Sequence, residues 1–296
     1  MDLKRYMAEK RATVDDALER YMPEPHGPAA ALIKAMNYSL FAGGKRLRPI
    51  LCIAGAEAVG GDAQKVMPVA CALELIHTYS LIHDDLPAMD NDDLRRGKPT
   101  SHKVFGEAMA ILAGDGLLTE AFNMLARLEA PERASSGILK KIISLIATAS
   151  GWQGMVGGQA VDIQSEGKAI DAAVMDYIHS HKTGALITAS VTSGAVLGGG
   201  TGMQMDAVGL YGEKIGLAFQ IADDILDIEG NAEEMGKGVG GDSKKGKNTF
   251  PSVYGLNESK EILNLSIDAA IKSLENFDNK ADPLRQIARY IIERKK

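Results

Sequence analysis

The feature that most constrains this fold is a series of apolar patterns with helical spacing that runs through almost the whole chain. Apolar side chains recur every three or four residues, which places them on one face of a helix. No comparable stretch alternates apolar and polar residues as a half-buried strand would. We therefore predict an all-α helical bundle. The expected helices cover residues 13–22, 29–40, 48–59, 66–86, 105–128, 136–156, 169–197, 206–229 and 258–292.

Nothing in the sequence divides these helices into separate domains, so we expect one domain over residues 1–296. Two segments are predicted as loops. Residues 86–100 hold two prolines among many charges, and residues 230–248 are rich in glycine and lysine. Glycine and proline interrupt regular structure for different steric reasons, so both segments are expected to leave the helical pattern.

Charge and apolar content exclude several classes of protein. The net charge of −6 argues against nucleic acid as a partner. No apolar run reaches the roughly 18 residues that a membrane-spanning helix needs, and the charged N-terminus lacks the apolar middle of a secretion signal. Cys52 and Cys71 stand in apolar stretches without metal-like spacing, which favours two reduced core thiols. We predict a cytoplasmic protein that does not insert into a membrane.

Two clusters of aspartates interrupt apolar helical sequence. Their members are Asp84, Asp85 and Asp90 in the first cluster, and Asp223, Asp224 and Asp227 in the second. Asp223 and Asp227 are four residues apart and share a helix face, whereas Asp224 points about 100° away from Asp223. In the first cluster Pro87 cannot continue a regular helix. A break there would bring Asp90 back beside Asp84.

Aspartates at this spacing repel one another, so the pattern makes sense where a cation lies between them. Mg²⁺ typically binds one or two protein carboxylates together with phosphates and water. A single cluster of this kind is often only a solvated helix face or cap, but two clusters flanked by apolar helix are harder to explain in that way. A calcium-storage loop lacks its glycine spacing here, and a phosphohydrolase reading of His83-Asp84 lacks a second His-Asp pair.

Basic residues accompany the first cluster. Residues 43–48 read Gly-Gly-Lys-Arg-Leu-Arg at the start of a predicted helix, where glycines allow close approach and a helix N-terminus favours an anion. Arg95 and Arg96 follow the aspartates directly. Arginine offers a planar fork that matches phosphate oxygens. A surface cap for residues 43–45 and a core-edge role for His77 remain open alternatives.

Polar residues also interrupt apolar helix farther along the chain. Residues 182–184, Lys-Thr-Gly, fall within a predicted helix. A lysine followed by glycine destabilises an apolar helix, which suggests a local distortion that serves a function. The alternative is a lysine at the helix edge whose ammonium group reaches solvent. Gln159 and Asp162 are three residues apart and occupy neighbouring positions of one helix face. Lys237 and Lys247 stand in the glycine-rich loop, where ordinary solvated lysines would look the same.

Taken in order, these segments resemble the trans-isoprenyl diphosphate synthases, and among them the bacterial-type farnesyl diphosphate synthases. The combination is specific although no single piece is, and it spans about residues 30–255. The resemblance implies a single-domain helical bundle around a deep apolar cavity, with the aspartate clusters facing each other at its mouth, in a homodimer. The matching stretches are residues 43–49, 77–100, 158–162, 182–184, 220–227 and 236–251.

The resemblance also implies a role for each matching residue. Three Mg²⁺ ions, with Mn²⁺ able to substitute, would be held by Asp84, Asp90 and Asp223, supported by Asp85, Asp224 and Asp227. Isopentenyl diphosphate would be bound by Lys45, Arg48, His77 and Arg96. The allylic diphosphate would be bound by Arg95, Lys182, Lys237 and Lys247. Catalysis would rest on Lys182, Thr183, Gln220 and Arg95, with Gln159 and Asp162 supporting from behind.

The implied reaction is ionisation, condensation and elimination. Metals and cations neutralise the leaving diphosphate, isopentenyl diphosphate attacks the allylic cation, and the released diphosphate takes up the proton. Water must be excluded from the cation. Residues 230–248 and the basic tail 293–296 are predicted lids.

Product length is predicted from the residues four and five positions before the first aspartate, which form the cavity floor in this family. Here they are Ser80 and Tyr79, and the tyrosine ring is expected to stop growth at farnesyl diphosphate. A geranylgeranyl or geranyl diphosphate synthase is the alternative. A class I terpene cyclase lacks the Gly-Gly-Lys site, and a non-catalytic partner subunit is expected to have lost part of these sets.

Overall fold

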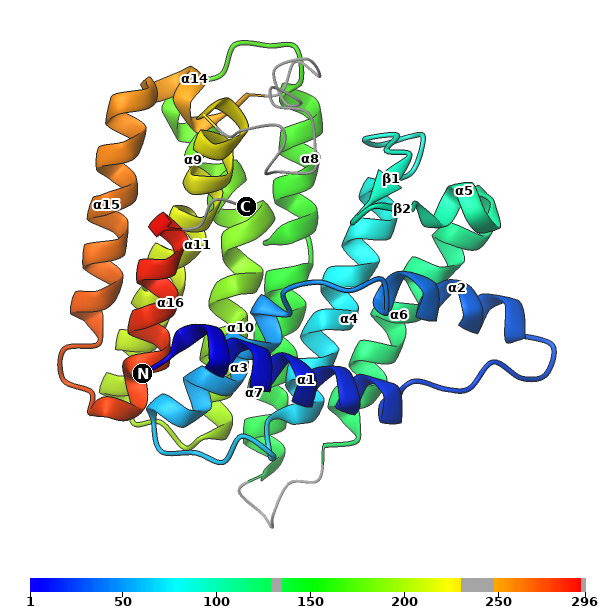
Figure 1. The fold of residues 1–296 in the computed structure, drawn as a ribbon, viewed down its shortest axis with the longest axis horizontal. Helices are drawn as coiled ribbons and strands as arrows, with labels where there is room; N and C mark the ends of the chain where they lie inside the picture. The colour runs from blue at the N-terminus through cyan, green and yellow to red at the C-terminus, as the bar shows by residue number, and fades with distance from the viewer. Residues whose placement is uncertain (129–134, 230–247, 294–296) are drawn as a thin grey trace. The chain divides into compact units, whose positions relative to one another are not determined.

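The computed structural model describes residues 1–128, 135–229 and 248–293 (Figure 1). Helices account for nearly all regular structure in this part of the chain, and its two strands have two residues each. The prediction of an all-α protein is therefore confirmed. The deep apolar cavity stays a prediction.

By their internal contacts the described residues form two compact units, each made of more than one segment of the chain. The amino-terminal unit comprises Lys4–Ile50 and Gln64–Ile143, and the carboxy-terminal unit comprises Met1–Leu3, Leu51–Ala63 and Ser144–Lys296 as far as it is described. Helices α3 (Leu47–Ala58) and α7 (Ser135–Ser150) begin in one unit and end in the other. The expectation of one domain stays a prediction.

The amino-terminal unit is built around α4. This helix packs mainly against α6, and α2 packs on both. Pro68 stands at the start of α4, where its fixed φ suits the first turn. Leu73, Leu75 and Ile76 are fully buried, so α4 is apolar on more than one face, as a central helix must be. The elements of this unit are α1 (Leu3–Tyr21), α2 (Ala30–Leu40), α4 (Met67–Asp84), β1 (Leu94–Arg95), β2 (Lys98–Pro99), α5 (Ser101–Phe105) and α6 (Glu107–Ala126).

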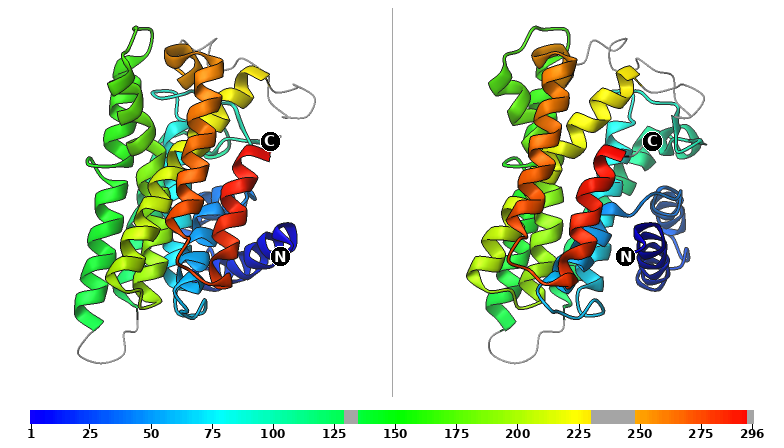
Figure 2. Two further views of the ribbon diagram at one scale, coloured as in Figure 1. Left: turned by 90° about the vertical axis from the view of Figure 1, so that its left-hand side faces the viewer. Right: turned by 60° about the vertical axis from the view of Figure 1, so that its left-hand side comes forward.

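The carboxy-terminal unit is organised by the long helix α11. Helices α10, α15 and α16 pack against it, and Figure 2 shows α11, α15 and α16 running alongside one another. The fully buried Tyr211 of α11 donates its hydroxyl hydrogen bond to Leu284 O at 2.7 Å, which ties α16 to this core. The elements are α8 (Met155–Ser165), α9 (Ala172–Ile178), η1 (His179–Gly184), α10 (Ala185–Leu197), α11 (Gly202–Glu229), α14 (Phe250–Tyr254), α15 (Leu256–Ser273), η2 (Asn279–Ala281) and α16 (Asp282–Glu293).

Several predicted helices are broken where the sequence pattern was read as continuous. The prediction for residues 258–292 is wrong, because α15 ends at Ser273 and α16 begins at Asp282. The Asp278 side chain accepts a hydrogen bond from Lys280 N, which starts a new helical turn, and Pro283 stands in the first turn of α16. The stretch 136–156 is likewise split, since α7 ends at Ser150 and α8 begins at Met155.

Two further differences lie at the ends of predicted elements. Helix α1 begins at Leu3, ten residues before the expected start. The predicted loop 86–100 contains the hairpin β1–β2, whose two turn residues Arg96 and Gly97 have φ of 53° and 75°. Positive φ at both turn positions matches the right-handed twist of a two-residue hairpin.

In the described part of the chain, no helix is both long enough and apolar enough to cross a membrane.

Candidate active site

The first aspartate cluster stands where α4 stops. Asp84 is the last residue of the helix, and Asp85 N donates to Leu81 O at 3.1 Å as its cap. After Pro87 the chain folds back, so that Asp90 N donates to Asp84 O at 2.9 Å. The predicted break in the helix, and the return of Asp90 to the backbone of Asp84, are therefore confirmed.

Asp85 and Arg95 form the connection between the aspartates and the hairpin. Two nitrogens of the Arg95 guanidinium, Nε and Nη2, lie 2.7 Å and 2.5 Å from Asp85 Oδ1. Arg95 Nη2 also reaches Asp92 Oδ2 at 3.3 Å. Burial raises the pKa of the Asp85 carboxyl, and the charge of Arg95 only partly offsets that rise. One predicted metal-supporting carboxylate and one predicted diphosphate-binding arginine are thus paired with each other.

The glycine-rich loop and Arg96 approach closely. Gly43 and Gly44 have φ of 92° and 137°, a backbone conformation that side chains disfavour. A β-carbon on Gly44 would lie 2.8 Å from the guanidinium atoms of Arg96. Arg96 Nη1 also donates to Gly43 O. The positive φ therefore favours glycine at both positions, and at Gly44 a side chain would also displace the Arg96 guanidinium.

Positive charge gathers around His77 on α4. The pKa of His77 is held well below its ordinary value, first by burial and then by nearby guanidinium groups, so the imidazole is neutral at pH 7. Those groups belong to Arg48, Arg96, Arg95 and Arg46. Three of the four residues predicted to bind isopentenyl diphosphate, Arg48, His77 and Arg96, are thereby brought together. Lys45 stands in the loop with Gly43 and Gly44, two residues before the start of α3.

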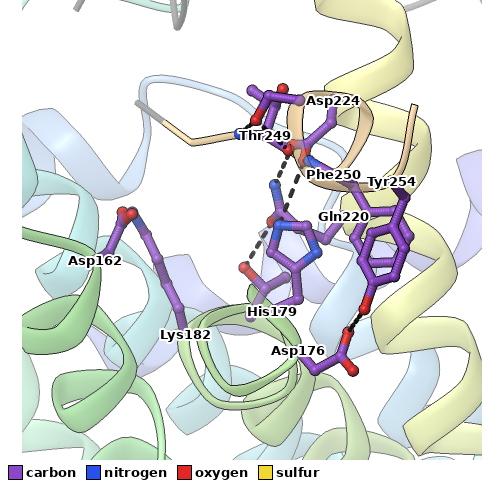
Figure 3. A network of polar contacts seen from close by, with 11 residues as sticks. Asp162, Asp176, His179, Lys182, Gln220, Asp224, Thr249, Phe250 and Tyr254 are labelled. Carbon is purple, nitrogen blue, oxygen red and sulfur yellow. Dashed lines mark hydrogen bonds and ion pairs between the residues drawn. The ribbon is translucent and has the colours of Figure 1, made fainter. Parts of the chain in front are cut away.

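The second cluster divides into different environments, as helix geometry predicts. Asp224 on α11 is buried, whereas Asp223 and Asp227 are part-exposed. Phe250 N donates to Asp224 Oδ2 at 2.7 Å, and Gln220 Nε2 donates to Oδ1 at 3.0 Å (Figure 3). The carboxylate of Asp224 is therefore occupied by protein donors in this structure.

A chain of contacts extends from Asp224 to the predicted catalytic residues. His179 Nε2 lies 3.3 Å from Asp224 Oδ2, and its ring stacks on Phe250 with 5.4 Å between centroids. Thr183 Oγ1 donates to Gln220 Oε1 at 2.9 Å. Figure 3 shows His179 of η1, Gln220 and Asp224 of α11 and Phe250 at the start of α14 converging on one another. The network fixes the orientation of the Gln220 amide.

Lys182 lies in a true distortion of the helix, as the sequence suggested. Residues His179–Gly184 form η1, a π-helical turn between α9 and α10. Such turns often occur at functional sites. Lys182 Nζ lies 2.6 Å from Asp162 Oδ2 on α8, an ion pair visible in Figure 3. Gly158 makes this approach possible, because a β-carbon there would lie 2.2 Å from Lys182 N.

These groups line a small cavity of about 100 Å³ within the carboxy-terminal unit. The wall carries the ammonium group of Lys182, two carboxylates, one imidazole and three hydroxyl or amide side chains, two of which form the Thr183–Gln220 hydrogen bond. The lining residues are Asp162, Ile178, His179, Lys182, Thr183, Gln220, Asp224 and Asn248. Asn248 donates to Ser165 O at 3.0 Å, which holds the end of the described segment against α8.

The aspartates fit a magnesium ion by the chemistry of their donors. Within the residues that the structure describes, no three His, Cys, Asp or Glu side chains converge as a complete metal centre. Mg²⁺ needs only one or two protein carboxylates when phosphates and water supply its other ligands. The part-exposed aspartates of both clusters meet that requirement. They are Asp84, Asp90, Asp223 and Asp227.

Other predicted residues have simpler positions. Tyr79 on α4 is buried and meets His83 edge-on, with 5.4 Å between ring centroids. Ser80 Oγ donates to His77 O in the same helix at 2.9 Å. Gln159 lies on α8. Two predicted lysines, Lys237 and Lys247, lie outside the described residues. The same holds for both predicted lids, of which only Asn248 and Glu293 are described.

Sequence reasoning missed three residues of these networks. His179 and Phe250 both contact Asp224, and Arg46 is buried beside the glycine loop. The sequence gives no separate signal for any of the three. His179 is one of two nearby histidines, Phe250 is an aromatic residue after a polar run, and Arg46 is a second cation in a basic motif. Their partners are distant in sequence, so only the fold reveals them.

Comparisons with known proteins agree with these observations. A family model described as polyprenyl synthetase matches residues 29–288. A farnesyl diphosphate synthase from Geobacillus stearothermophilus is 49% identical over 294 residues, covering 99% of this chain and 98% of the relative. A geranylgeranyl diphosphate synthase from Cyanophora paradoxa is 46% identical over 294 residues, with 99% and 97% covered. A solved FPP/GFPP synthase from Zymomonas mobilis is 39% identical with a TM-score of 0.87, covering 98% of this chain and 99% of that one.

Proposed function

This chain belongs to the polyprenyl synthetase family and is a prenyltransferase, and we propose that it joins isopentenyl diphosphate head-to-tail to dimethylallyl and geranyl diphosphate, with farnesyl diphosphate as its main product. The observation that carries this proposal is the Asp85–Arg95 ion pair. It joins the carboxylates that end α4 to the arginines around His77, so acidic and basic groups occur together in one unit. Two diphosphate substrates, one of them bound with metal, require that combination.

Isopentenyl diphosphate is assigned to the basic loop. Lys45, Arg48 and Arg96 supply cations, and arginine forks bind phosphate oxygens in pairs. His77 is neutral beside the arginines, so it adds a hydrogen-bonding group without further charge repulsion. The N-terminus of α3 lies directly after the loop and favours an anion.

The allylic diphosphate is assigned to the aspartates, with Arg95, Lys182, Lys237 and Lys247. Mg²⁺, held by Asp84, Asp90 and Asp223, would supply the positive charge that stabilises the departing diphosphate. Asp85, Asp224 and Asp227 support this arrangement. Asp224 does so through Phe250 and Gln220, to which it is hydrogen-bonded.

The protein groups near the developing allylic cation are Lys182, Thr183 and Gln220. The Thr183 hydroxyl holds the amide of Gln220 in place, so its dipole is oriented before the reaction begins. Asp162 pairs with Lys182 and fixes the ammonium group, and Gln159 stands on the same helix. The double bond of isopentenyl diphosphate then attacks the allylic carbon, and the released diphosphate accepts the proton that is lost.

A farnesyl product rests on Tyr79, whose buried ring is proposed as the floor of the product cavity. Geranylgeranyl diphosphate is the second candidate product, because the Cyanophora paradoxa relative bears that name. The homodimer and the cytoplasmic location stay predictions.

Release of diphosphate tests the proposed reaction. The purified chain is incubated with dimethylallyl diphosphate, isopentenyl diphosphate and Mg²⁺, and inorganic diphosphate is measured. We expect one diphosphate for each isopentenyl unit consumed, and none after chelation of the metal. Release from the allylic substrate alone, with a hydrocarbon product, would instead indicate a terpene cyclase.

A further inference from the structure

Arg46 is the one cation of the segment 43–48 to which the proposed function gives no task. It stands between Lys45 and Arg48, yet its side chain is only 2% exposed. Its guanidinium donates to three partners from different parts of the amino-terminal unit. These are Asp15 Oδ1 through Nε at 2.7 Å, Glu74 Oε1 through Nη1 at 2.8 Å and Leu40 O through Nη2 at 2.9 Å.

The backbone of Arg46 is as unusual as its side chain. Its φ of 52° lies in the left-handed region, which residues other than glycine adopt only at a cost in free energy. Its carbonyl accepts the hydrogen bond from Ile50 N at 3.0 Å, which begins α3. The conformation of this one residue therefore sets the direction in which the chain leaves the glycine loop and enters the helix.

The charge of Arg46 is already balanced within the protein. Glu74 on α4 is 1% exposed, and it and Asp15 raise the pKa of Arg46 despite its burial. A substrate diphosphate would have to compete with both carboxylates for this guanidinium. Arg46 is thus unsuited to bind substrate directly, in contrast to the residues on either side of it.

Stability alone does not explain the buried pair of Arg46 and Glu74. Glu74 Oε2 is buried without a hydrogen-bond partner, and a half-satisfied buried ion pair contributes less than well-packed apolar side chains of the same volume. Buried ionic groups can, however, select one conformation among several. A three-way anchor is what a loop with positive φ values at Gly43, Gly44 and Arg46 requires to hold one shape.

We infer that Arg46 is a positioning residue for isopentenyl diphosphate, which acts by fixing the loop 43–46 through its bonds to Asp15, Glu74 and Leu40. This loop carries Lys45 and leads directly into the first turn of α3, where Arg48 lies. The inference rests on the proposed function, since it assumes that this loop binds that substrate. Lysine cannot replace arginine here, because one ammonium group does not reach three partners in the geometry of a planar fork.

The test compares binding with stability. The double variant Arg46→Met with Glu74→Met removes both members of the buried pair, so no uncompensated charge remains in the core. Arg285→Met is the matched control, since Arg285 donates to the backbone oxygens of Leu274, Phe277 and Asp278 in the other unit. Calorimetry gives the Kd for isopentenyl diphosphate, steady-state kinetics give both KM values, and thermal unfolding gives Tm.

We expect the double variant to bind isopentenyl diphosphate about tenfold more weakly, with the KM for geranyl diphosphate unchanged. Arg46→Lys is expected to weaken the same Kd by a smaller factor, and it remains informative if the double variant does not fold. The control is expected to lower Tm without changing the Kd. Wild-type affinity in a folded double variant or in Arg46→Lys would overturn the inference alone. A wild-type protein that does not bind isopentenyl diphosphate would overturn the proposed function as well.

Discussion

Replacing Gly158 with alanine is expected to lower kcat about a hundredfold while leaving the protein folded, because α8 and η1 approach more closely here than a methyl group allows. A β-carbon at this position would lie 2.2 Å from Lys182 N and 2.7 Å from Lys182 Cα. Both are backbone atoms, so no side chain can rotate away. An ordinary contact begins at 3.4 Å, so the two segments must separate by about 1.2 Å.

That separation acts directly on the Lys182–Asp162 ion pair. Asp162 follows Gly158 by one helical turn and moves with α8, so the present 2.6 Å distance would exceed hydrogen-bonding range. Displacing a catalytic group by about 1 Å can reduce turnover about a hundredfold. Overpacking at such a contact costs about 1–3 kcal/mol of unfolding free energy. We therefore expect a large fall in kcat with a moderate fall in stability.

The measurements are kcat for farnesyl diphosphate formation and the urea midpoint of unfolding. Gly209→Ala is the matched control, because Gly209 lies within α11 and a β-carbon there meets nothing within 4 Å. Alanine at that position is expected to stabilise the helix by about 1 kcal/mol and leave kcat unchanged. A Gly158→Ala variant with wild-type kcat would show that the position of Lys182 does not limit the reaction.

Three further predictions concern product length, the second aspartate cluster and alkaline pH. Tyr79→Ala is expected to shift the main product toward geranylgeranyl diphosphate by opening the proposed floor; chromatography of the dephosphorylated alcohols checks this, and an unchanged product would place the floor elsewhere. Asp224→Asn is expected to lower the unfolding free energy by about 2 kcal/mol, since a buried donor loses its acceptor. Asp223→Asn is expected to keep stability and to raise the Mg²⁺ concentration needed for turnover. Equal effects of the two variants on both properties would contradict the different roles of the two aspartates. Burial, and then Glu74, raises the pKa of the Cys71 thiol to about 12, above its ordinary 9.0. Because the folded state holds this proton more tightly, the stability from Cys71 is present below pH 9 and is lost by about 1.4 kcal/mol per pH unit between 9 and 12. Urea midpoints at pH 8 and 10 should differ less in Cys71→Ala than in wild type, and the same difference in both would refute the assignment.

Helical periodicity predicted where helices lie better than where they end. The apolar spacing continues through Leu274 and Phe277, so residues 258–292 read as one helix although α15 and α16 are separate. The cap at Asp278 and the following Asp282-Pro283 carried the missing signal. At η1 the sequence succeeded, because a lysine followed by glycine in apolar helix is costly, and the distortion it implied is present.

The candidate site was predictable where the chemistry is local. Helix geometry predicted that Asp224 lies on a different face from Asp223 and Asp227. Pro87 predicted the break in the helix after Asp84. What the sequence lacked is the identity of distant partners. The Asp224 carboxylate meets the backbone of Phe250, and Arg46 meets Asp15, through contacts between residues 26 and 31 positions apart. In a run of basic residues, the buried Arg46 and its less buried neighbours Lys45 and Arg48 look alike in the sequence.

Incorporation of labelled isopentenyl diphosphate tests the central claim most directly. The purified protein is incubated with dimethylallyl diphosphate, radiolabelled isopentenyl diphosphate and Mg²⁺, and the dephosphorylated products are separated by chain length. We predict that the label appears mainly in farnesol and that chelation of the metal abolishes it. Label in no alcohol longer than the allylic starter, with any starter tried, would contradict the assignment of head-to-tail condensation to this chain.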